Sequence, residues 1–239
     1  MKRGNLYISP RSWEIIMESI INEEIMGNNG SSSNSSSKLI QNFYITGLGK
    51  IEEIGKSAAK KAASFISDLT GKPVDIGVVS VMITTLMEIK KELKNEYKIF
   101  TGINFSGDIS GVGVLIFSEE SALTLSKSML AEMGMDDDED ELNDMKISAI
   151  NEACNLIISA YVDTLANSIG VSLNMSPPFF NKGIEQEIME NIFKEHNTTN
   201  PDDIILTFKS ELYSKGIGSG FEVLMIMPPE SINLLFQKL

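Results

Sequence analysis

Apolar residues recur along the chain at two different spacings, and each spacing predicts a different kind of element. Positions three or four apart place apolar side chains on one helical face and predict helices at 10–25, 50–69, 119–132, 142–169, 184–195 and 230–238. Short apolar runs predict strands at 74–83, 97–105, 112–117, 171–175, 204–212 and 221–227. Gly71 and Gly170 mark the ends of the two long helices.

The order of these elements repeats. A shift of 99 residues lays Glu53 on Glu152, and a similar shift relates the later parts of the two halves. Such internal similarity predicts two related units, at about 47–134 and 142–239, which share one core. Short turns between strands favour antiparallel pairing. We therefore expect an α/β (α+β) fold of two pseudo-symmetric αβββα repeats in one domain. It should have a largely antiparallel sheet and two long helices, with an extra helix in the second half alone.

A stretch rich in Gly, Ser and Asn separates the N-terminal helix from this body. Residues 27–38 read GNNGSSSNSSSK, the composition of a flexible linker. The chain is therefore expected to divide into an amphipathic helix over 1–26, a linker over 27–38 and one folded domain over 39–239. The helix either docks on the body or binds a partner, and we favour docking.

Charge and cysteine usage narrow the functional classes. The chain of 239 residues has a formal net charge of −13, which argues against a nucleic-acid partner, because phosphates attract clustered Lys and Arg. Cys154 is the single cysteine, so no internal disulfide can form, and we expect it to be a small core residue of a cytoplasmic protein. No apolar run approaches a membrane span, and the N-terminus lacks the apolar block of a signal peptide, so we expect no membrane insertion.

Several common enzyme chemistries lack their residues. His196 is the single histidine and lies in a polar stretch that predicts a loop, and one histidine with one cysteine cannot form a usual zinc site. The GLGK sequence at 47–50 lacks the spacing of a phosphate-binding loop. We therefore expect no metal or cofactor on this chain.

One polar stripe runs along the predicted helix at 142–169. Ser148, Glu152, Asn155 and Ser159 are spaced by four, three and four residues, which places them on one face. Exposure to water is the simplest explanation of such a stripe, since most surface helices have one. Asparagine is nevertheless a mediocre helix former, and its place in mid-helix needs a reason.

The spacing of Ser148, Glu152, Asn155 and Pro177 resembles the signature of the CheC/CheX/FliY family of bacterial chemotaxis phosphatases. That signature has Asp or Ser, then Glu, Asn and Pro at these intervals. The resemblance covers about residues 47–239. The two halves favour a CheC-like member over the shorter CheX, and we expect no FliY-type C-terminal domain.

The resemblance implies a function in two-component signalling: hydrolysis of the aspartyl phosphate of the response regulator CheY. Asn155 would position the attacking water, since an amide both accepts and donates hydrogen bonds without adding charge. Glu152 would pair with a lysine of the receiver domain. Ser148 would support the contact, and Pro177 would shape the chain beside the site. The Mg²⁺ of the reaction is expected in the partner's receiver domain.

The first half departs from the signature. Gly49, Glu53, Lys56 and Val78 occupy its four positions. A charged lysine cannot accept a hydrogen bond from water. The sequence therefore predicts a working site at Glu152 and Asn155 and a degenerate first site at Glu53 and Lys56. The alternative is a binding module with little or no catalysis, which holds the deamidase CheD or a flagellar switch component.

Overall fold

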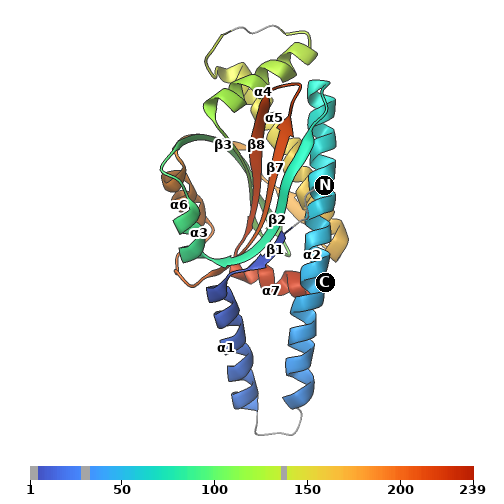
Figure 1. Ribbon diagram of the computed structural model, residues 1–239, viewed down its shortest axis with the longest axis vertical. Coiled ribbons are helices and arrows are strands. Elements are labelled where there is room, and N and C mark those ends of the chain that lie inside the picture. Colours follow the sequence, from blue (N-terminus) through green and yellow to red (C-terminus); the bar gives the residue numbers. More distant parts are fainter. Residues whose placement is uncertain (1–4, 28–32, 136–138) are drawn as a thin grey trace.

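Helices are interspersed with strands along the chain, and the strands join in one sheet (Figure 1). The computed structural model describes residues 5–27, 33–135 and 139–239. The helices are α1 (Pro10–Gly27), α2 (Ser33–Thr70), α3 (Leu86–Glu92), α4 (Glu119–Glu132), α5 (Asp144–Ile169), α6 (Glu185–Glu195) and α7 (Pro229–Lys238). The strands are β1 (Asn5–Ile8), β2 (Asp75–Thr85), β3 (Tyr97–Gly107), β4 (Gly111–Phe117), β5 (Leu173–Met175), β6 (Phe179–Ile184), β7 (Ile204–Ser214) and β8 (Ser219–Met227).

The sheet has the order β1-β2-β7-β8-β4-β3-β5, and β6 pairs with β3 beside β5. Every pairing is antiparallel except that of β1 with β2. At the centre β4 of the first half pairs with β8 of the second. On either side, β2 pairs with β7, and β6 pairs with β3. Strands of each half thus pair with strands of the other half, so the two repeats share one sheet, and its largely antiparallel pairing confirms the predicted fold class.

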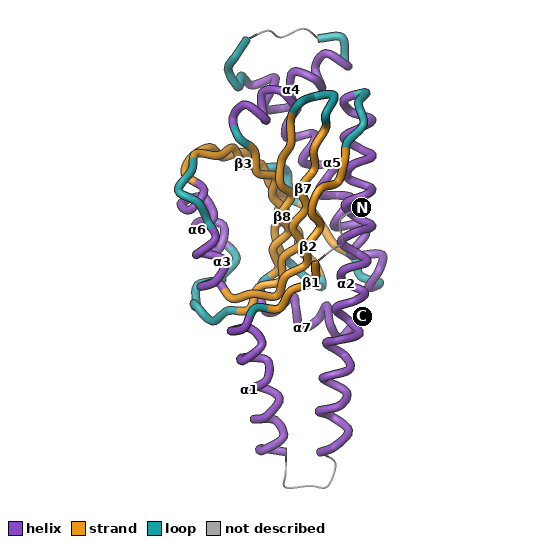
Figure 2. The backbone as a smooth tube through the Cα atoms, viewed as in Figure 1, coloured by secondary structure: helices purple, strands orange, loops and turns teal. Residues whose placement is uncertain are grey.

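Helices cover both faces of the sheet (Figure 2). The larger buried cluster lies where α2, α4, α5 and α7 pack on one face, and the smaller cluster joins α3 and α6 to the other. Strand β3 shows how the sequence divides between them, because successive side chains of a strand point to opposite faces. Ile103 and Phe105 belong to the larger cluster, whereas Phe100 belongs to the smaller.

The predicted linker is wrong over residues 33–38. Helix α2 begins at Ser33, and not near residue 50, so these residues are helical. Residues 28–32 of the predicted linker lie outside the described part of the chain. Composition underestimates such an extension, because each residue that continues an existing helix adds one backbone hydrogen bond, even where its own propensity is low.

The extra helix of the second half has a counterpart, which also corrects the prediction. Helix α3 begins at Leu86, and α6 begins at Glu185, 99 residues later. Thr85 and Glu88 form a capping box at the start of α3: the Thr85 amide donates to the Glu88 carboxylate at 3.1 Å, and the Glu88 amide donates to the Thr85 hydroxyl at 3.3 Å. Each repeat is therefore αβαββα. A helix of seven residues is too short to show the apolar period clearly.

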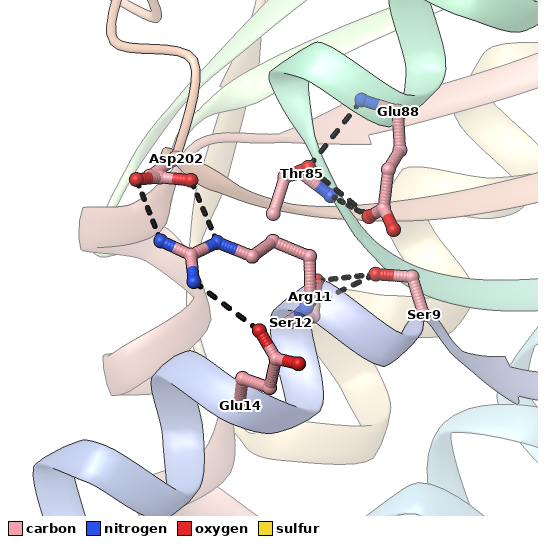
Figure 3. A network of polar contacts seen from close by, with 7 residues as sticks. All are labelled: Ser9, Arg11, Ser12, Glu14, Thr85, Glu88 and Asp202. Atoms are coloured by element: carbon pink, nitrogen blue, oxygen red, sulfur yellow. Dashed lines mark hydrogen bonds and ion pairs between the residues drawn. The ribbon is translucent and has the colours of Figure 1, made fainter.

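The N-terminal segment docks on the body, as we favoured. Strand β1, which the sequence did not predict, pairs in parallel with β2, and the Ser9 amide donates to the Ile83 carbonyl at 2.8 Å. At the start of α1 the Arg11 guanidinium donates to both carboxylate oxygens of Asp202, at 3.0 and 2.9 Å, and to Glu14 at 3.2 Å (Figure 3). Among the described residues, no helix combines the length and apolar character needed to span a membrane.

Candidate functional site

Helix α5 carries the polar stripe, and its two ends are well defined. The Asn143 side chain caps its start by accepting from the Lys146 amide at 3.0 Å. Gly170 ends it in the left-handed conformation, with φ of 67°, as the sequence predicted. Gly71 does the same after α2, with φ of 62°. Between these ends α5 buries one face against the sheet and leaves the stripe at its edge.

Cys154 lies between the two central stripe residues in the sequence but faces the core. Its side chain is fully buried, which confirms the predicted role. Burial raises the pKa of the thiol to about 12, so it stays protonated at neutral pH and cannot act as a nucleophile there. The chemistry of this helix therefore lies with its polar stripe.

Glu152 is exposed and Asn155 is partly exposed, and within the described residues neither side chain has a hydrogen bond or ion pair. Asn151, by contrast, is committed to the sheet, because its side-chain oxygen accepts from the Thr101 hydroxyl at 2.7 Å. The Ser148 hydroxyl donates to the Asp144 carbonyl of its own helix at 2.7 Å. Glu152 and Asn155 are one turn apart, so together they offer a free carboxylate and a free amide.

Pro177 lies in a β-bulge at the edge of the sheet. Met175 pairs with Phe105 and Phe179 pairs with Gly102, so the outer strand advances by four residues while β3 advances by three. The additional residue falls at Pro177 and Pro178. Proline has no amide hydrogen to donate to β3, which is why the ladder breaks here.

Two contacts place this bulge along α5. Asn151 meets Thr101 of β3, and two turns later the Ser159 hydroxyl lies 3.7 Å from the sulfur of Met175. The bulge lies between these contacts along the sheet, and Asn155 lies between them along the helix. The structure therefore brings Pro177 to the level of Asn155 on the same edge.

A polar network that the sequence did not reveal supports the bulge. Two hydrogen bonds join Asn104 and Ser176. The Ser176 amide donates to the Asn104 carbonyl at 2.9 Å, and the Asn104 amide donates to the Ser176 hydroxyl at 3.1 Å. That hydroxyl donates to the Pro177 carbonyl at 3.0 Å. His196 Nε2 lies 3.0 Å from the Asn104 side-chain oxygen. His196 follows the last residue of α6 as its C-cap and lies in a turn, which confirms the predicted loop.

The first half presents a different surface at the equivalent positions. Glu53 is exposed, but Lys56 binds Glu52 in an ion pair of 2.6 Å, so its charge is already engaged. Helices α2 and α5 run antiparallel (Figure 1), and Lys61 lies 3.8 Å from Asp163 where they meet. The two stripes therefore lie on opposite sides of this contact.

The described residues contain no cluster of three or more His, Cys, Asp or Glu side chains that could hold a metal ion. The α5 stripe itself offers one amide, one carboxylate and two hydroxyl groups.

Comparison with known proteins identifies similar sequences and a similar solved structure. The family model of the chemotaxis phosphatase CheX matches residues 99–199. A protein of Halobacterium salinarum named "Putative CheY-P phosphatase CheC1" is 22% identical over 169 residues, which are 70% of this chain and 83% of that protein. The flagellar motor switch phosphatase FliY of Bacillus subtilis is 24% identical over 128 residues, 54% of this chain and 33% of FliY. The crystal structure of Thermotoga maritima FliY superposes with a TM-score of 0.58 at 19% identity, covering 78% of this chain and 91% of that one.

Together these matches support a member of the CheC/CheX/FliY family. The segment matched by the CheX model runs from β3 to the turn after α6. It contains Ser148, Glu152, Asn155 and Pro177. The equivalent positions on α2 (the α2 stripe: Gly49, Glu53 and Lys56) lie outside it.

Proposed function

We propose that this chain dephosphorylates the aspartyl phosphate of a CheY-type response regulator at the α5 stripe. One observation carries the proposal: the Asn155 amide and the Glu152 carboxylate are unengaged neighbours on an accessible helix face. Names of relatives support the same chemistry, since CheC1 is named for CheY-P and FliY is named a motor switch phosphatase.

In the proposed reaction a water molecule attacks the phosphorus atom of the acyl phosphate. The bond from phosphorus to the aspartate oxygen breaks, the aspartate leaves with the electron pair, and the water's proton passes to the released phosphate or to solvent. Asn155 accepts a hydrogen bond from this water and holds it in line with the breaking bond. Phosphoryl transfer depends on such alignment and on charge more than on covalent catalysis.

Glu152 has a docking role in this proposal. Its carboxylate pairs with a lysine of the receiver domain and sets the distance from Asn155 to the phosphoryl group. Ser148 lies one turn earlier, where its hydroxyl can still accept a hydrogen bond from the receiver. Pro177 forms the wall of the site beside Asn155. The receiver domain supplies Mg²⁺, which neutralises charge on the phosphoryl oxygens.

Decay of phosphorylated CheY in the presence of the chain tests this assignment. Asn155→Ala should lower the accelerated rate by about 100-fold, because the water loses its alignment. Glu152→Ala should weaken receiver binding and so raise KM. The matched control is Asn167→Ala, which removes an exposed amide from the same helix outside the stripe and should leave the rate unchanged. An Asn155→Ala protein as active as the wild type would exclude the mechanism.

A second candidate is a binding module with weak or no catalysis. The degenerate α2 stripe favours it, because Lys56 is held by Glu52 and offers no water-binding amide. CheD or a flagellar switch component would be the partner. Stable capture of purified CheD, with no acceleration of CheY-phosphate decay at saturating receiver, would support this function over the first.

A further inference from the structure

The bulge at Pro177 and Pro178 has a counterpart in the first half. Strand β2 shifts its register against β7 between Ile76 and Val79. Ile76 lies 99 residues before Met175, the last paired residue before the second bulge. Both halves therefore carry a β-bulge at the equivalent place. In each half it lies where the first strand after the long helix pairs with a strand of the other half.

The two bulges differ in what supports them. In the second half the Ser176 hydroxyl and the Asn104 side chain take part in the network that ends at His196. The equivalent residues in the first half are Gly77, which has no side chain, and Glu211, which replaces the amide by a carboxylate. Helix α3 spans seven residues whereas α6 spans eleven, so α3 ends before the position equivalent to His196.

The end of α6 is shaped to place His196 against β3. The His196 amide donates to the Ile192 carbonyl at 3.2 Å, and the next residue, Asn197, has φ of 54°. Asparagine tolerates this left-handed conformation better than other non-glycine residues. The Thr198 amide then donates to the Phe193 carbonyl at 2.9 Å, which closes the helix end. Both Phe193 and Thr198 are buried, so this turn is fixed by packing.

The network reaches the proposed site through the sheet. Ile103 and Phe105 of β3 pack in the cluster shared with α5, so the side chain of Asn104 between them points to the opposite face, where α6 lies. His196 thus contacts the Asn104 side chain on the α6 face of the sheet, while the Asn104 backbone is hydrogen-bonded to Ser176. A residue on one face of the sheet thereby supports the wall of a site on the other.

We propose that Asn104 and His196 are positioning residues for the phosphatase reaction, because they brace the Ser176–Pro177 segment and fix the wall beside Asn155. This inference rests on the proposed function. The brace occurs in the half that retains the full signature and is missing from the half that has lost it. A purely structural role in the bulge would be expected in both halves.

Substitutions at His196 test the inference with phosphorylated CheY as substrate. His196→Leu removes the donor at similar size, and His196→Gln restores an N–H donor. His196→Leu should lower kcat by about 10-fold with KM for the receiver unchanged, because misplacement acts on the aligned complex. His196→Gln should recover most of the rate. Hydrogen exchange of the Ser176 amide should accelerate in the leucine variant and return towards normal in the glutamine variant. Glu211→Leu, the first-half counterpart of a change at Asn104, is the control and should leave kcat unchanged.

The outcomes separate the two proposals. Normal kcat for His196→Leu, together with the loss expected for Asn155→Ala, would overturn the inference and leave the proposed function intact. A general loss of stability with no rescue by His196→Gln would also overturn it. If Asn155→Ala were fully active, or the wild type inactive, both proposals would fail.

Discussion

At the scale of single residues, the site depends on which polar groups the fold leaves free. Helix α5 carries Asn151 and Asn155 one turn apart, and residue type alone gives no reason to prefer either as a functional amide. The structure separates them, since Thr101 occupies the first and the second is without a described partner. The family resemblance singled out Asn155. The hydrogen bond that engages Asn151 comes from Thr101, 50 residues away in the sequence, so the sequence alone does not reveal it.

The single histidine leads to a prediction about pH. Burial lowers the pKa of His196 below its ordinary value near 6.5, although the neighbouring Glu195 partly opposes this. The unfolded chain therefore binds a proton at a higher pH than the folded chain does. As the pH falls through 6.5 towards the folded pKa, this histidine lowers the free energy of unfolding.

Urea unfolding at pH 7.5 and pH 5.5 measures this contribution. The wild type should lose more stability between the two values than His196→Gln, which cannot titrate but keeps a donor for Asn104. Equal losses in the two proteins would show that His196 titrates alike in the folded and unfolded chains.

At the scale of elements, the sequence predicted the long, periodic segments and missed the short ones. Helix α5 was predicted within two residues of its bounds, because its apolar period extends over seven turns and Gly170 ends it. Strand β1 has four residues and α3 has seven, too few to establish a period. Strand β6 follows two prolines. In the sequence such a pair indicates the end of a strand, whereas in the structure it forms a bulge after which pairing with β3 resumes.

The docked N-terminal segment gives a prediction at this scale. Deleting residues 1–27 exposes the edge of β2 and removes the buried Ile16 from the core. Loss of that side chain alone should destabilise the protein by about 1.5–3 kcal/mol, and the free edge should promote self-association. CheY-phosphate decay should be unchanged at a temperature where the truncated chain is folded, since the α5 stripe lies elsewhere.

Thermal melting and light scattering check this, with Arg11→Ala as the control. That substitution breaks the exposed contact with Asp202 but keeps β1 in place, so it should change melting little. A truncated chain that melts like the wild type and scatters no more light than it does would contradict the role of β1 as a cover for the sheet edge.

At the scale of the whole molecule, two copies of one unit share a sheet and differ in chemistry. The internal shift predicted the pseudo-symmetry from sequence, and β4 with β8 at the centre of the sheet bears it out. The internal shift could not predict the contacts of Asn104 with Ser176 and His196. Asn104 and Ser176 come from different halves, 72 residues apart, and meet only because strands of the two halves pair. Sequence comparison of the halves shows which signature residues are lost, but not which supporting residues were lost with them.

This difference predicts the result of an attempt to restore the first site. In an Asn155→Ala background, Lys56→Asn returns the amide to α2 and releases Glu52 from its ion pair. Without Ser at Gly49, Pro at Val78 or a braced bulge at Gly77, the amide has no fixed wall beside it. Recovery should stay below about 10-fold, because alignment of the water requires more than the amide itself. Decay of phosphorylated CheY with the single and double variants, each verified as folded by its melting temperature, measures this. Recovery to near the wild-type rate would mean that the amide alone suffices and that the support of the bulge is dispensable.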